Sequence, residues 1–354
     1  MFREQASPWL SEYLVKQIHI TQWLSTQPAP IPLVDVRSPK EYERGHIPDA
    51  VNIPLFSNEE RKEVGILYKK QGRDQAVMKG LELIGPKLAD LAKQATEIAP
   101  SKKIAVHCWR GGMRSESMAW LWEKAGFEVQ VIMGGYKAYR KQVHEEFRSP
   151  YQIIILAGKT GSGKTDILQA LAEAGEQVID LEGLAHHKGS VFGGIGQEEQ
   201  PTGESFENSI HQQLVRMDRH KPIWIEDESH GIGKVHIPEG LWVQMKKAPI
   251  MVVDCPLEAR VNRLVEEYGH FPTDQLIEAI TKIGKRLGGE KLKTAVDALK
   301  AGDVGKVAAL SLTYYDQTYA YALENRKEQI RHSAEYGDCV SDVVQQLILQ
   351  SKSI

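Results

Sequence analysis

The sequence has few cysteines, no long hydrophobic run and little excess of charge of one sign. Its three cysteines stand far apart among 354 residues, and their odd number argues against a disulfide framework. No apolar segment is long enough to span a bilayer. The first residues also lack the apolar core and the cleavage site of a signal peptide. We therefore expect a protein of the reducing cytoplasm that makes no contact with a membrane.

The near balance of charges gives no global sign of a nucleic-acid partner, because the net charge is −3. A local basic surface can still bind RNA whatever the total charge. The chain is long enough for two domains, and 42% of its residues are hydrophobic, which supplies two cores. A charged stretch that ends at Pro150 separates two groups of apolar segments. We place the domains at 1–145 and 146–354.

Short apolar segments alternate with helical patterns in both domains, which predicts parallel α/β sheets. The strand-like segments are 31–37, 50–54, 103–108, 129–133, 153–158, 177–183, 222–227 and 249–255. From about residue 257 onward the pattern is helical and polar, and we expect no further strand there. The predicted fold class is α/β, with two parallel-sheet domains and a helical C-terminal region.

The first candidate site is a reactive cysteine, Cys108, in a loop between a predicted strand and a helix. Backbone N–H groups in such a loop can converge on one point, and the helix N-terminus adds positive charge. Glycines allow tight curvature and arginines add full charges, so the thiol pKa should be lowered. A buried structural cysteine is the alternative, and it is our interpretation of Cys255 and Cys339. The predicted anion cradle consists of Trp109, Arg110, Gly111, Gly112, Met113 and Arg114.

Two segments that flank this loop in sequence resemble known motifs. Residues 33–54 resemble the opening motif of rhodanese domains, and residues 133–141 resemble their closing motif. The resemblance implies that Cys108 carries a persulfide or a related chalcogen adduct. It also implies that Asp35 and Arg37 of the opening motif stabilise or organise the site. The same loop fits the HCxxGxxR[ST] pattern of cysteine-dependent phosphatases, some of which share the rhodanese fold, so this alternative stays open.

The second candidate site is a phosphate-binding loop that matches GxxxxGK[ST] between a predicted strand and a helix. Its residues are Gly158, Lys159, Thr160, Gly161, Ser162, Gly163, Lys164 and Thr165. In such a loop the backbone amides bind phosphate oxygens, Lys164 adds a positive charge, and the Thr165 hydroxyl can bind Mg²⁺. Glu226 and Asp227 end a later strand and are candidates for orienting Mg²⁺ or water, or else form an ordinary acidic strand end.

Weaker signals follow in the second domain. Arg260 and Arg263 are three residues apart on one helix and are candidates for an anion clamp. The basic stretch 282–293 is either a contact surface for RNA phosphates or an ordinary solvated helical face. The glycine-rich segment 183–204 is typical of a binding loop or lid as much as of a connector. No histidine or cysteine spacing indicates a structural metal.

Taken along its whole length, the chain resembles bacterial tRNA 2-selenouridine synthases. The segments that carry the resemblance beyond the two loops are 160–168, 180–193, 206–210, 225–233 and 287–292. The resemblance implies a transferase that converts 5-substituted 2-thiouridine at the wobble position of tRNA into 2-selenouridine through an S-geranyl intermediate. The implied co-substrates are geranyl diphosphate and selenophosphate, with Mg²⁺ as a candidate ion. The implied partners are the tRNA anticodon region and an enzyme that supplies selenophosphate.

Two other classes of enzyme remain open at this point. One is an ATP-dependent sulfurtransferase of the rhodanese type that acts on tRNA, in which the phosphate-binding loop would use ATP. The other is a cysteine-dependent phosphatase with a regulatory nucleotide domain. The residues of the cysteine loop fit a thiolate beside a tetrahedral oxyanion site in both the rhodanese and the phosphatase interpretation.

Overall fold

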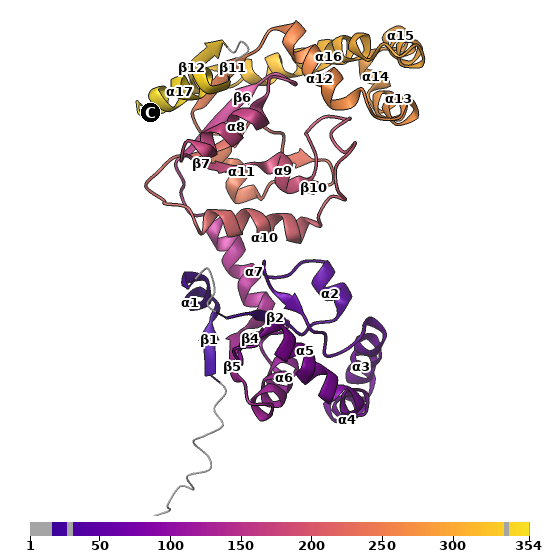
Figure 1. The fold of residues 1–354 in the computed structure, drawn as a ribbon, viewed down its shortest axis with the longest axis vertical. Coiled ribbons are helices and arrows are strands. Elements are labelled where there is room, and N and C mark those ends of the chain that lie inside the picture. Colours follow the sequence, from indigo (N-terminus) through magenta and orange to yellow (C-terminus); the bar gives the residue numbers. More distant parts are fainter. Residues whose placement is uncertain (1–15, 27–30, 336–339, 354) are drawn as a thin grey trace, which may run out of the picture. The chain divides into compact units, whose positions relative to one another are not determined.

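A computed structural model of the chain describes residues 16–26, 31–335 and 340–353 and falls into two compact units (Figure 1). Unit 1 comprises residues 1–146 and unit 2 comprises residues 147–354. Each unit has its own five-stranded parallel sheet and its own hydrophobic core. Cys339 lies outside the described residues. The predicted α/β class with two parallel sheets is confirmed.

The sheet of unit 1 has the strand order β1-β5-β4-β2-β3, and every pair in it is parallel. Its strands are β1 (Lys16–His19), β2 (Leu33–Asp35), β3 (Val51–Asn52), β4 (Lys103–His107) and β5 (Glu128–Met133). The central strand β4 is buried on both faces, as is usual where helices cover both sides of a parallel sheet. All parallel strands end at the same edge, so the loop after β4 opens there.

Helices cover the sheet of unit 1 on both sides, and Trp122 of α6 lies fully buried in the core. Capping boxes begin α2 at Ser38 and α3 at Ser57, which satisfies free amides of the first turn. The helices are α1 (Ile20–Ser25), α2 (Pro39–Glu43), α3 (Asn58–Gln71), α4 (Arg73–Ile84), the 3₁₀ turn η2 (Gly85–Lys87), α5 (Leu88–Ile98), α6 (Met113–Lys124) and α7 (Gly135–Glu146).

The sheet of unit 2 has the parallel order β12-β11-β6-β8-β7, and the short strands β9 and β10 form an antiparallel pair beside it. The strands are β6 (Ile153–Gly158), β7 (Gln177–Ile179), β8 (Ile223–Glu226), β9 (Gly231–Ile232), β10 (Val235–His236), β11 (Ile250–Asp254) and β12 (Ile330–Glu335). The fully buried central strand β6 leads directly into the predicted phosphate-binding loop.

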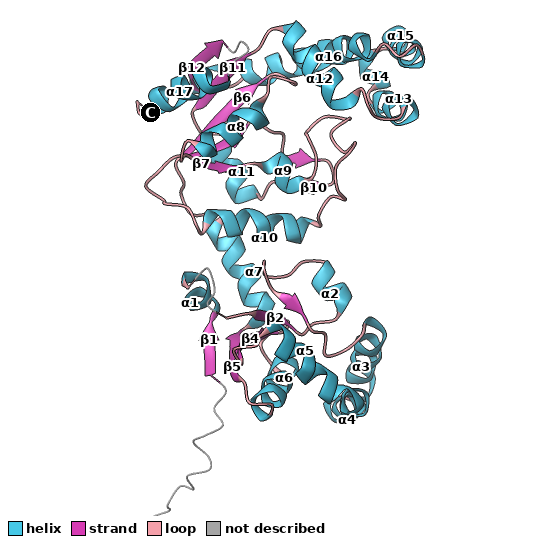
Figure 2. Ribbon diagram, viewed as in Figure 1, coloured by secondary structure: helices cyan, strands magenta, loops and turns pink. Residues whose placement is uncertain are grey.

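Figure 2 shows that the C-terminal part of unit 2 is mainly helical, with α13, α14 and α15 gathered beside α16. These helices share a second hydrophobic core that includes Tyr268, Leu276 and Leu299. The helices of unit 2 are α8 (Lys164–Glu173), α9 (Leu181–Ala185), α10 (Gly203–Leu214), α11 (Glu239–Met245), α12 (Leu257–Tyr268), α13 (Thr273–Lys282), α14 (Gly284–Leu287), α15 (Gly289–Lys300), α16 (Val304–Glu324), the 3₁₀ turn η3 (Lys327–Gln329) and α17 (Val340–Ser351).

The expectation of no strand after residue 257 is wrong, because β12 pairs with β11 at the edge of the sheet. Its sequence IRHSAE is polar and only Ala334 in it is buried, so the strand carries little hydrophobic alternation. The short strands β1, β9 and β10 were likewise not predicted. In the part of the chain that the structure describes, no helix combines the length and the apolar character needed to cross a membrane.

Candidate functional site

The loop that carries Cys108 connects β4 to α6 and is held in place by the start of α7. The backbone N–H groups of Tyr136 and Lys137 donate to the carbonyl oxygens of Cys108 and Trp109, each at 2.9 Å. Gly111 has a φ of +67°, and a Cβ there would lie 2.7 Å from the carbonyl oxygen of Ile132. Only glycine fits this close approach, which curves the loop around the cysteine.

The thiol of Cys108 lies beneath this loop, with only 3% of the residue exposed. The Ser115 hydroxyl lies 3.3 Å from Sγ, within donating distance. Burial alone would raise the thiol pKa. The Ser115 hydroxyl, the charge of Arg114 and the backbone N–H groups of Arg110 and Ser115 outweigh burial and lower the pKa of Cys108 below its ordinary value. The loop therefore stabilises the thiolate form of Cys108 more than water stabilises that of a free cysteine.

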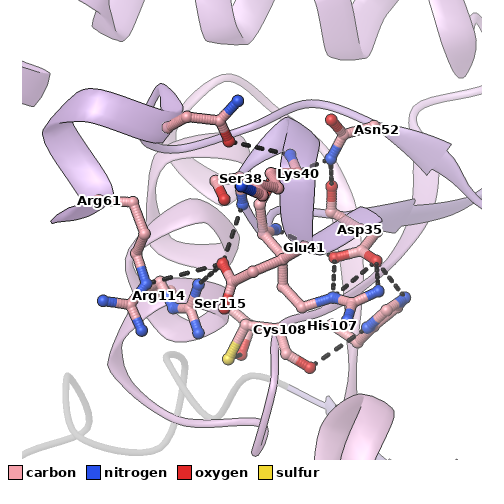
Figure 3. A network of polar contacts seen from close by, with 12 residues as sticks. Asp35, Ser38, Lys40, Glu41, Asn52, Arg61, His107, Cys108, Arg114 and Ser115 are labelled. Atoms are coloured by element: carbon pink, nitrogen blue, oxygen red, sulfur yellow. Dashed lines mark hydrogen bonds and ion pairs between the residues drawn. The ribbon is translucent and has the colours of Figure 1, made fainter. Parts of the chain in front are cut away.

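Two residues that the sequence analysis did not single out, Glu41 and Arg61, join the same network (Figure 3). Arg114 Nη1 donates to Glu41 Oε2 at 2.8 Å, and Arg61 Nε lies 3.6 Å from the same oxygen. Burial would raise the pKa of Glu41, but Arg114, the Ser38 N–H and Arg61 hold it below its ordinary value. Glu41 is the N3 residue of α2 and closes the capping box that begins at Ser38, which is a local sequence signal for its position. The charge of Arg114 is thus shared between the thiolate and a carboxylate.

Asp35 and Arg37 of the opening motif form a buried ion pair. Arg37 Nη2 donates to Asp35 Oδ2 at 2.6 Å, and its guanidinium lies 4.0 Å from the centre of the Tyr136 ring. His107 Nε2 lies 3.8 Å from the same Asp35 oxygen. Burial would raise the pKa of Asp35, but His107 and Arg37 lower it. This pair supports the strand end and the aromatic ring beside the cysteine loop and does not reach the thiol.

The outer side of the cysteine loop presents a mixture of charge and apolar surface. Trp109 is 38% exposed and Met113 is 44% exposed, and Arg110 is exposed between them. The Trp109 ring is supported at 5.8 Å by Tyr136. A small oxyanion would meet the arginines and the loop amides, and an organic group attached to it would meet Trp109 and Met113.

The sharing of Arg114 predicts opposite shifts for two charge-removing variants. Arg114→Gln removes the positive charge beside the thiolate, so the thiol pKa should rise. Glu41→Gln removes the carboxylate that neutralises Arg114, so the thiol pKa should fall. The measurement is the pH dependence of Cys108 alkylation by iodoacetamide, followed by mass spectrometry of the Cys108 peptide. If the midpoints of the two alkylation curves shifted in the same direction, distortion of the loop and not the charge of Arg114 would determine the thiol pKa.

The phosphate-binding loop of unit 2 connects β6 to α8, as its motif requires. Gly163 caps α8 with a φ of +78°, and a Cβ there would lie 2.9 Å from the Arg263 guanidinium. Lys164 Nζ donates to the carbonyl oxygen of Gly158 at 3.1 Å, so its ammonium points back across the loop. Thr165 is exposed at the start of α8. The structure brings all eight predicted loop residues together around the N-terminus of this helix.

Both predicted clamp arginines of α12 contact this loop through its carbonyl oxygens. Arg260 is 3% exposed and forms two hydrogen bonds with Asp316 of α16, at 2.8 and 2.7 Å. It also lies 3.3 Å from the carbonyl oxygen of Thr160. Arg263 donates to the carbonyl oxygen of Gly161 at 2.9 Å. Arg260 therefore braces the loop against α16, and Arg263 brings its guanidinium to the edge of the loop.

The two predicted carboxylates at the end of β8 lie in different surroundings. Asp227 pairs with Arg326 at 2.5 Å. Glu226 is buried and accepts from the Glu182 N–H at 2.7 Å. Burial and the nearby charge of Asp180 raise its pKa to about 8. The sequence indicated neither the ion pair of Asp227 nor the raised pKa of Glu226.

A third carboxylate, Glu228, interacts with the charge of Lys164 and was not predicted. Burial, together with the charge of Glu182 and a hydrogen bond to it, raises the pKa of Glu228 well above the ordinary value, and Lys164 opposes this shift. A Cβ on Gly189 would lie within 3.0 Å of carboxyl oxygens of both Glu182 and Glu228, so the two carboxyl groups meet at this glycine. The two carboxyl groups therefore lie together near the charge of Lys164 in the phosphate-binding loop.

An apolar cavity begins at Thr160 of the phosphate-binding loop and extends between the C-terminal helices. It contains about 450 Å³ of space counted with its open mouth. Apart from a few hydroxyl groups, its walls are aliphatic and aromatic. The lining residues are Thr160, Ser190, Phe192, Leu264, Tyr268, Leu276, Leu299, Val304, Val307, Ala308, Ser311, Leu312 and Tyr315. No sequence pattern separates these residues from an ordinary core, because several of them, including Tyr268, Leu276 and Leu299, belong to the buried core that these helices share.

The glycine-rich segment between α9 and α10 forms one wall of this cavity through Ser190 and Phe192. The Lys188 ammonium pairs with Glu267 of α12, and the Val191 N–H donates to the Tyr315 hydroxyl at 3.0 Å. The segment is thus fastened to α12 and α16 by polar contacts at the cavity. Within the described residues, no cluster of three or more histidine, cysteine, aspartate or glutamate side chains is arranged to hold a metal ion.

Comparison with known families assigns both units. The family model described as the tRNA 2-selenouridine synthase AAA domain matches residues 151–350, and the rhodanese-like domain model matches residues 19–142. A tRNA 2-selenouridine synthase of Proteus mirabilis is 36% identical over 342 residues, covering 86% of this chain and 92% of the relative. One of Shewanella woodyi is 35% identical over 336 residues, covering 84% and 90%.

A solved structure is also similar to one part of the chain. It is described as the N-terminal domain of a putative ATP/GTP binding protein from Clostridium difficile 630. It is 43% identical and covers 36% of this chain and 98% of that chain. The TM-score of 0.34 is too low to bear on the fold.

Proposed function

This chain belongs to the tRNA 2-selenouridine synthase family, and from that premise we propose that it replaces sulfur by selenium at the wobble uridine of tRNA in two steps. In the first step, the 2-thiouridine sulfur is alkylated by geranyl diphosphate in unit 2. In the second step, selenium from selenophosphate displaces the geranylated sulfur at the Cys108 loop. The resemblance in sequence and the chemistry of the two loops support this division.

The observation that carries the proposal is the apolar cavity that opens at Thr160 of the phosphate-binding loop. A ligand that occupies both must have a phosphate head and a hydrocarbon tail, and geranyl diphosphate has both. The diphosphate would lie against the loop amides and Lys164, and the prenyl chain would lie between α12, α15 and α16. Walls so poor in polar groups favour this ligand over ATP, whose ribose and base need polar partners.

The first step requires a place for the leaving group and for a proton. As the sulfur bonds to the first carbon of the prenyl chain, the carbon–oxygen bond to diphosphate breaks and charge develops on the diphosphate. Lys164 and the helix N-terminus stabilise that charge. Alkylation of the sulfur also releases the proton of N3 of the uracil ring. The carboxyl groups of Glu182 and Glu228, which meet at Gly189 near Lys164, are the acidic groups placed to accept it.

The second step uses the anion cradle of unit 1. The oxyanion of selenophosphate would bind the loop amides and Arg114, with its selenium near the Cys108 thiolate. The Cys108 thiolate bonds to C2 of the uracil ring, and the geranylated sulfur leaves as a thiolate. The selenium of selenophosphate then bonds to C2, the Cys108 sulfur leaves as the thiolate again, and water takes the phosphoryl group. Alkylation makes the sulfur a much better leaving group than the original thiocarbonyl. Trp109 and Met113 offer apolar contacts to the prenyl chain or the base.

The remaining requirements of the proposal concern Mg²⁺ and partners. The Thr165 hydroxyl and the diphosphate oxygens would hold a Mg²⁺ ion, which neutralises charge on the leaving group. Asp227 is paired with Arg326, and Glu226 is biased toward its neutral form, so neither offers a free carboxylate to the ion. The substrate is the anticodon region of tRNA, and a selenophosphate-supplying enzyme is the expected partner in the cytoplasm.

Prenyl chain length tests the proposal, because the cavity should contribute affinity in proportion to the carbons it buries. Dimethylallyl diphosphate has about five fewer carbons than geranyl diphosphate, and at about 0.8 kcal/mol per buried CH₂ it should bind up to roughly three orders of magnitude more weakly. Ala308→Phe fills part of the cavity and should weaken geranyl diphosphate at least ~10-fold. Inorganic diphosphate, which has only the head, should bind both proteins equally. Isothermal titration calorimetry of the wild type and Ala308→Phe with the three ligands gives the dissociation constants.

The reaction itself is followed by mass spectrometry of nucleosides from 2-thiouridine tRNA. With geranyl diphosphate but no selenophosphate, the product should be S-geranyl-2-thiouridine. With both, it should be 2-selenouridine. Consumption of ATP or release of phosphate from p-nitrophenyl phosphate, with no modified nucleoside, would replace the proposal by the sulfurtransferase or the phosphatase alternative.

A further inference from the structure

The basic stretch 282–293 forms a helical turn on the surface of unit 2. It runs from the end of α13 through α14 into the start of α15. It contains five cationic side chains and one carboxylate, Glu290, and all five cations are exposed. The cations are Lys282, Lys285, Arg286, Lys291 and Lys293.

The apolar residues of the same stretch fix the direction of these side chains. Ile283 and Leu287 are buried in the core that α13, α14 and α15 share, and Leu292 packs against it. A Cβ on Gly284 would lie 2.6 Å from a methyl group of Leu292, so the two helices approach closely at that point. The cations therefore stand on short, packed helices and face outward.

Most of this positive charge is not neutralised by the protein. Among the described residues, Lys285, Lys291 and Lys293 have no ion pair, and Lys282 has only Glu278 one turn before it, at 3.2 Å. Arg286 donates to the neutral Tyr314 hydroxyl at 3.2 Å. Gly289 lies between the two groups of cations, and a Cβ there would meet nothing within 4 Å. The surface is thus positive and unobstructed.

A polyanion is the partner that such a surface fits. The chain as a whole carries a net charge of −3, so a polyanionic substrate must be attracted by a local concentration of cations. The turn also belongs to the helices that enclose the apolar cavity, because Leu276 of α13 and Leu299 of α15 line it. A nucleic acid bound to the outside of this wall would lie beside the cavity in which the prenyl chain is proposed to bind.

We propose that Lys282, Lys285, Arg286, Lys291 and Lys293 form a docking surface for the sugar–phosphate backbone of tRNA. The inference rests on the proposed function for the identity of the polyanion. The contacts are electrostatic and independent of base sequence, so they position the tRNA and leave the choice of uridine to the sites. Each lost phosphate contact should weaken binding of any tRNA and reduce the dependence of affinity on salt.

The test is the binding of a fluorescently labelled tRNA that contains 2-thiouridine to the full-length protein, measured by anisotropy at several KCl concentrations. The triple variant K285Q/K291Q/K293Q should reduce the slope of log Kd against log [KCl] by about 2 to 3. At constant salt its Kd should rise at least ~10-fold. The matched control is K62Q/K69Q/K70Q on α3, whose exposed lysines share their helix with three glutamates. It should leave the slope unchanged. Thermal unfolding of each variant confirms that the fold is kept.

Two further results separate this inference from the proposed function. If the wild type produces S-geranyl-2-thiouridine and the triple variant keeps the wild-type Kd and slope, the docking surface is refuted and the proposed function stands. If the triple variant loses the salt-dependent binding and the wild type forms no modified nucleoside, the docking surface stands and the proposed function fails. An equal loss in the α3 control would also refute the docking surface, because binding would then follow total charge.

Discussion

Lys164→Ala is expected to block prenyl transfer, leaving 2-thiouridine unchanged when tRNA and geranyl diphosphate are supplied. The ammonium of Lys164 donates to the Gly158 carbonyl oxygen at 3.1 Å. With diphosphate bound, it would contact the leaving group as charge develops on it. Removal of one such preorganised donor costs about 10²–10³-fold in rate. Single-turnover formation of S-geranyl-2-thiouridine, measured by mass spectrometry, gives the size of the loss.

Two controls show whether the loss is confined to prenyl transfer. One is a variant of another exposed lysine, and the other is a tRNA substrate that already carries the geranyl group. Lys234→Ala, on the turn between β9 and β10, removes an exposed lysine of the same unit and should transfer geranyl at the normal rate. Lys164→Ala should still convert tRNA that already contains S-geranyl-2-thiouridine into the selenium product. If Lys164→Ala transferred geranyl as fast as the wild type, the phosphate-binding loop would not be the site of the prenyl diphosphate.

The head and the tail of the proposed ligand are coupled by a short chain of contacts. Asp316 follows Tyr315, a residue of the cavity wall, and holds Arg260 through two hydrogen bonds. Arg260 in turn lies 3.3 Å from the carbonyl oxygen of Thr160, where the cavity meets the phosphate-binding loop. A displacement of α16 by a bound prenyl chain would therefore also move Arg260 and the Thr160 carbonyl group of the loop. This gives a physical reason why tail binding would also orient the diphosphate.

The two loops could be predicted because each is encoded by neighbouring residues. A buried strand, a glycine-containing turn and the start of a helix follow one another within a few positions at both Cys108 and Lys164, and the structure has both turns where the motifs put them. The same locality explains why the central strands were found. Their buried runs are continuous, as is typical of parallel sheets covered on both faces.

What the sequence could not indicate depends on partners that are distant along the chain. Asp227 has the position of a carboxylate for Mg²⁺, but its partner Arg326 lies 99 residues further on. Arg260 has the spacing of an anion clamp, but Asp316 occupies its guanidinium. The edge strand β12 was missed because it buries one small residue, Ala334. The lining of the cavity follows from the packing of four helices and leaves no periodic signal of its own.

Cys108→Ser is expected to stall the reaction after prenyl transfer, so that S-geranyl-2-thiouridine accumulates when tRNA, geranyl diphosphate and selenophosphate are all present. The hydroxyl that replaces the thiol keeps the shape of the loop but stays protonated at neutral pH. The interactions that lower the pKa of Cys108, from Ser115, Arg114 and the loop amides, then have no thiolate to stabilise. Formation of 2-selenouridine should fall at least ~10³-fold, as is usual when a nucleophile is removed.

The matched control for this variant is Cys255→Ala, which removes the other described cysteine from the buried core of unit 2 and should leave both steps intact. Arg114→Gln should have an intermediate effect, because it keeps the thiol but removes a charge that lowers the thiol pKa and that would bind the oxyanion. Its rate of selenium transfer should lie between those of the wild type and Cys108→Ser. If Cys108→Ser still converted geranylated tRNA into 2-selenouridine at a normal rate, the cysteine would not be the nucleophile that displaces the geranylated sulfur. The loop would then act only by holding the oxyanion, and Arg114→Gln should be the more damaging of the two.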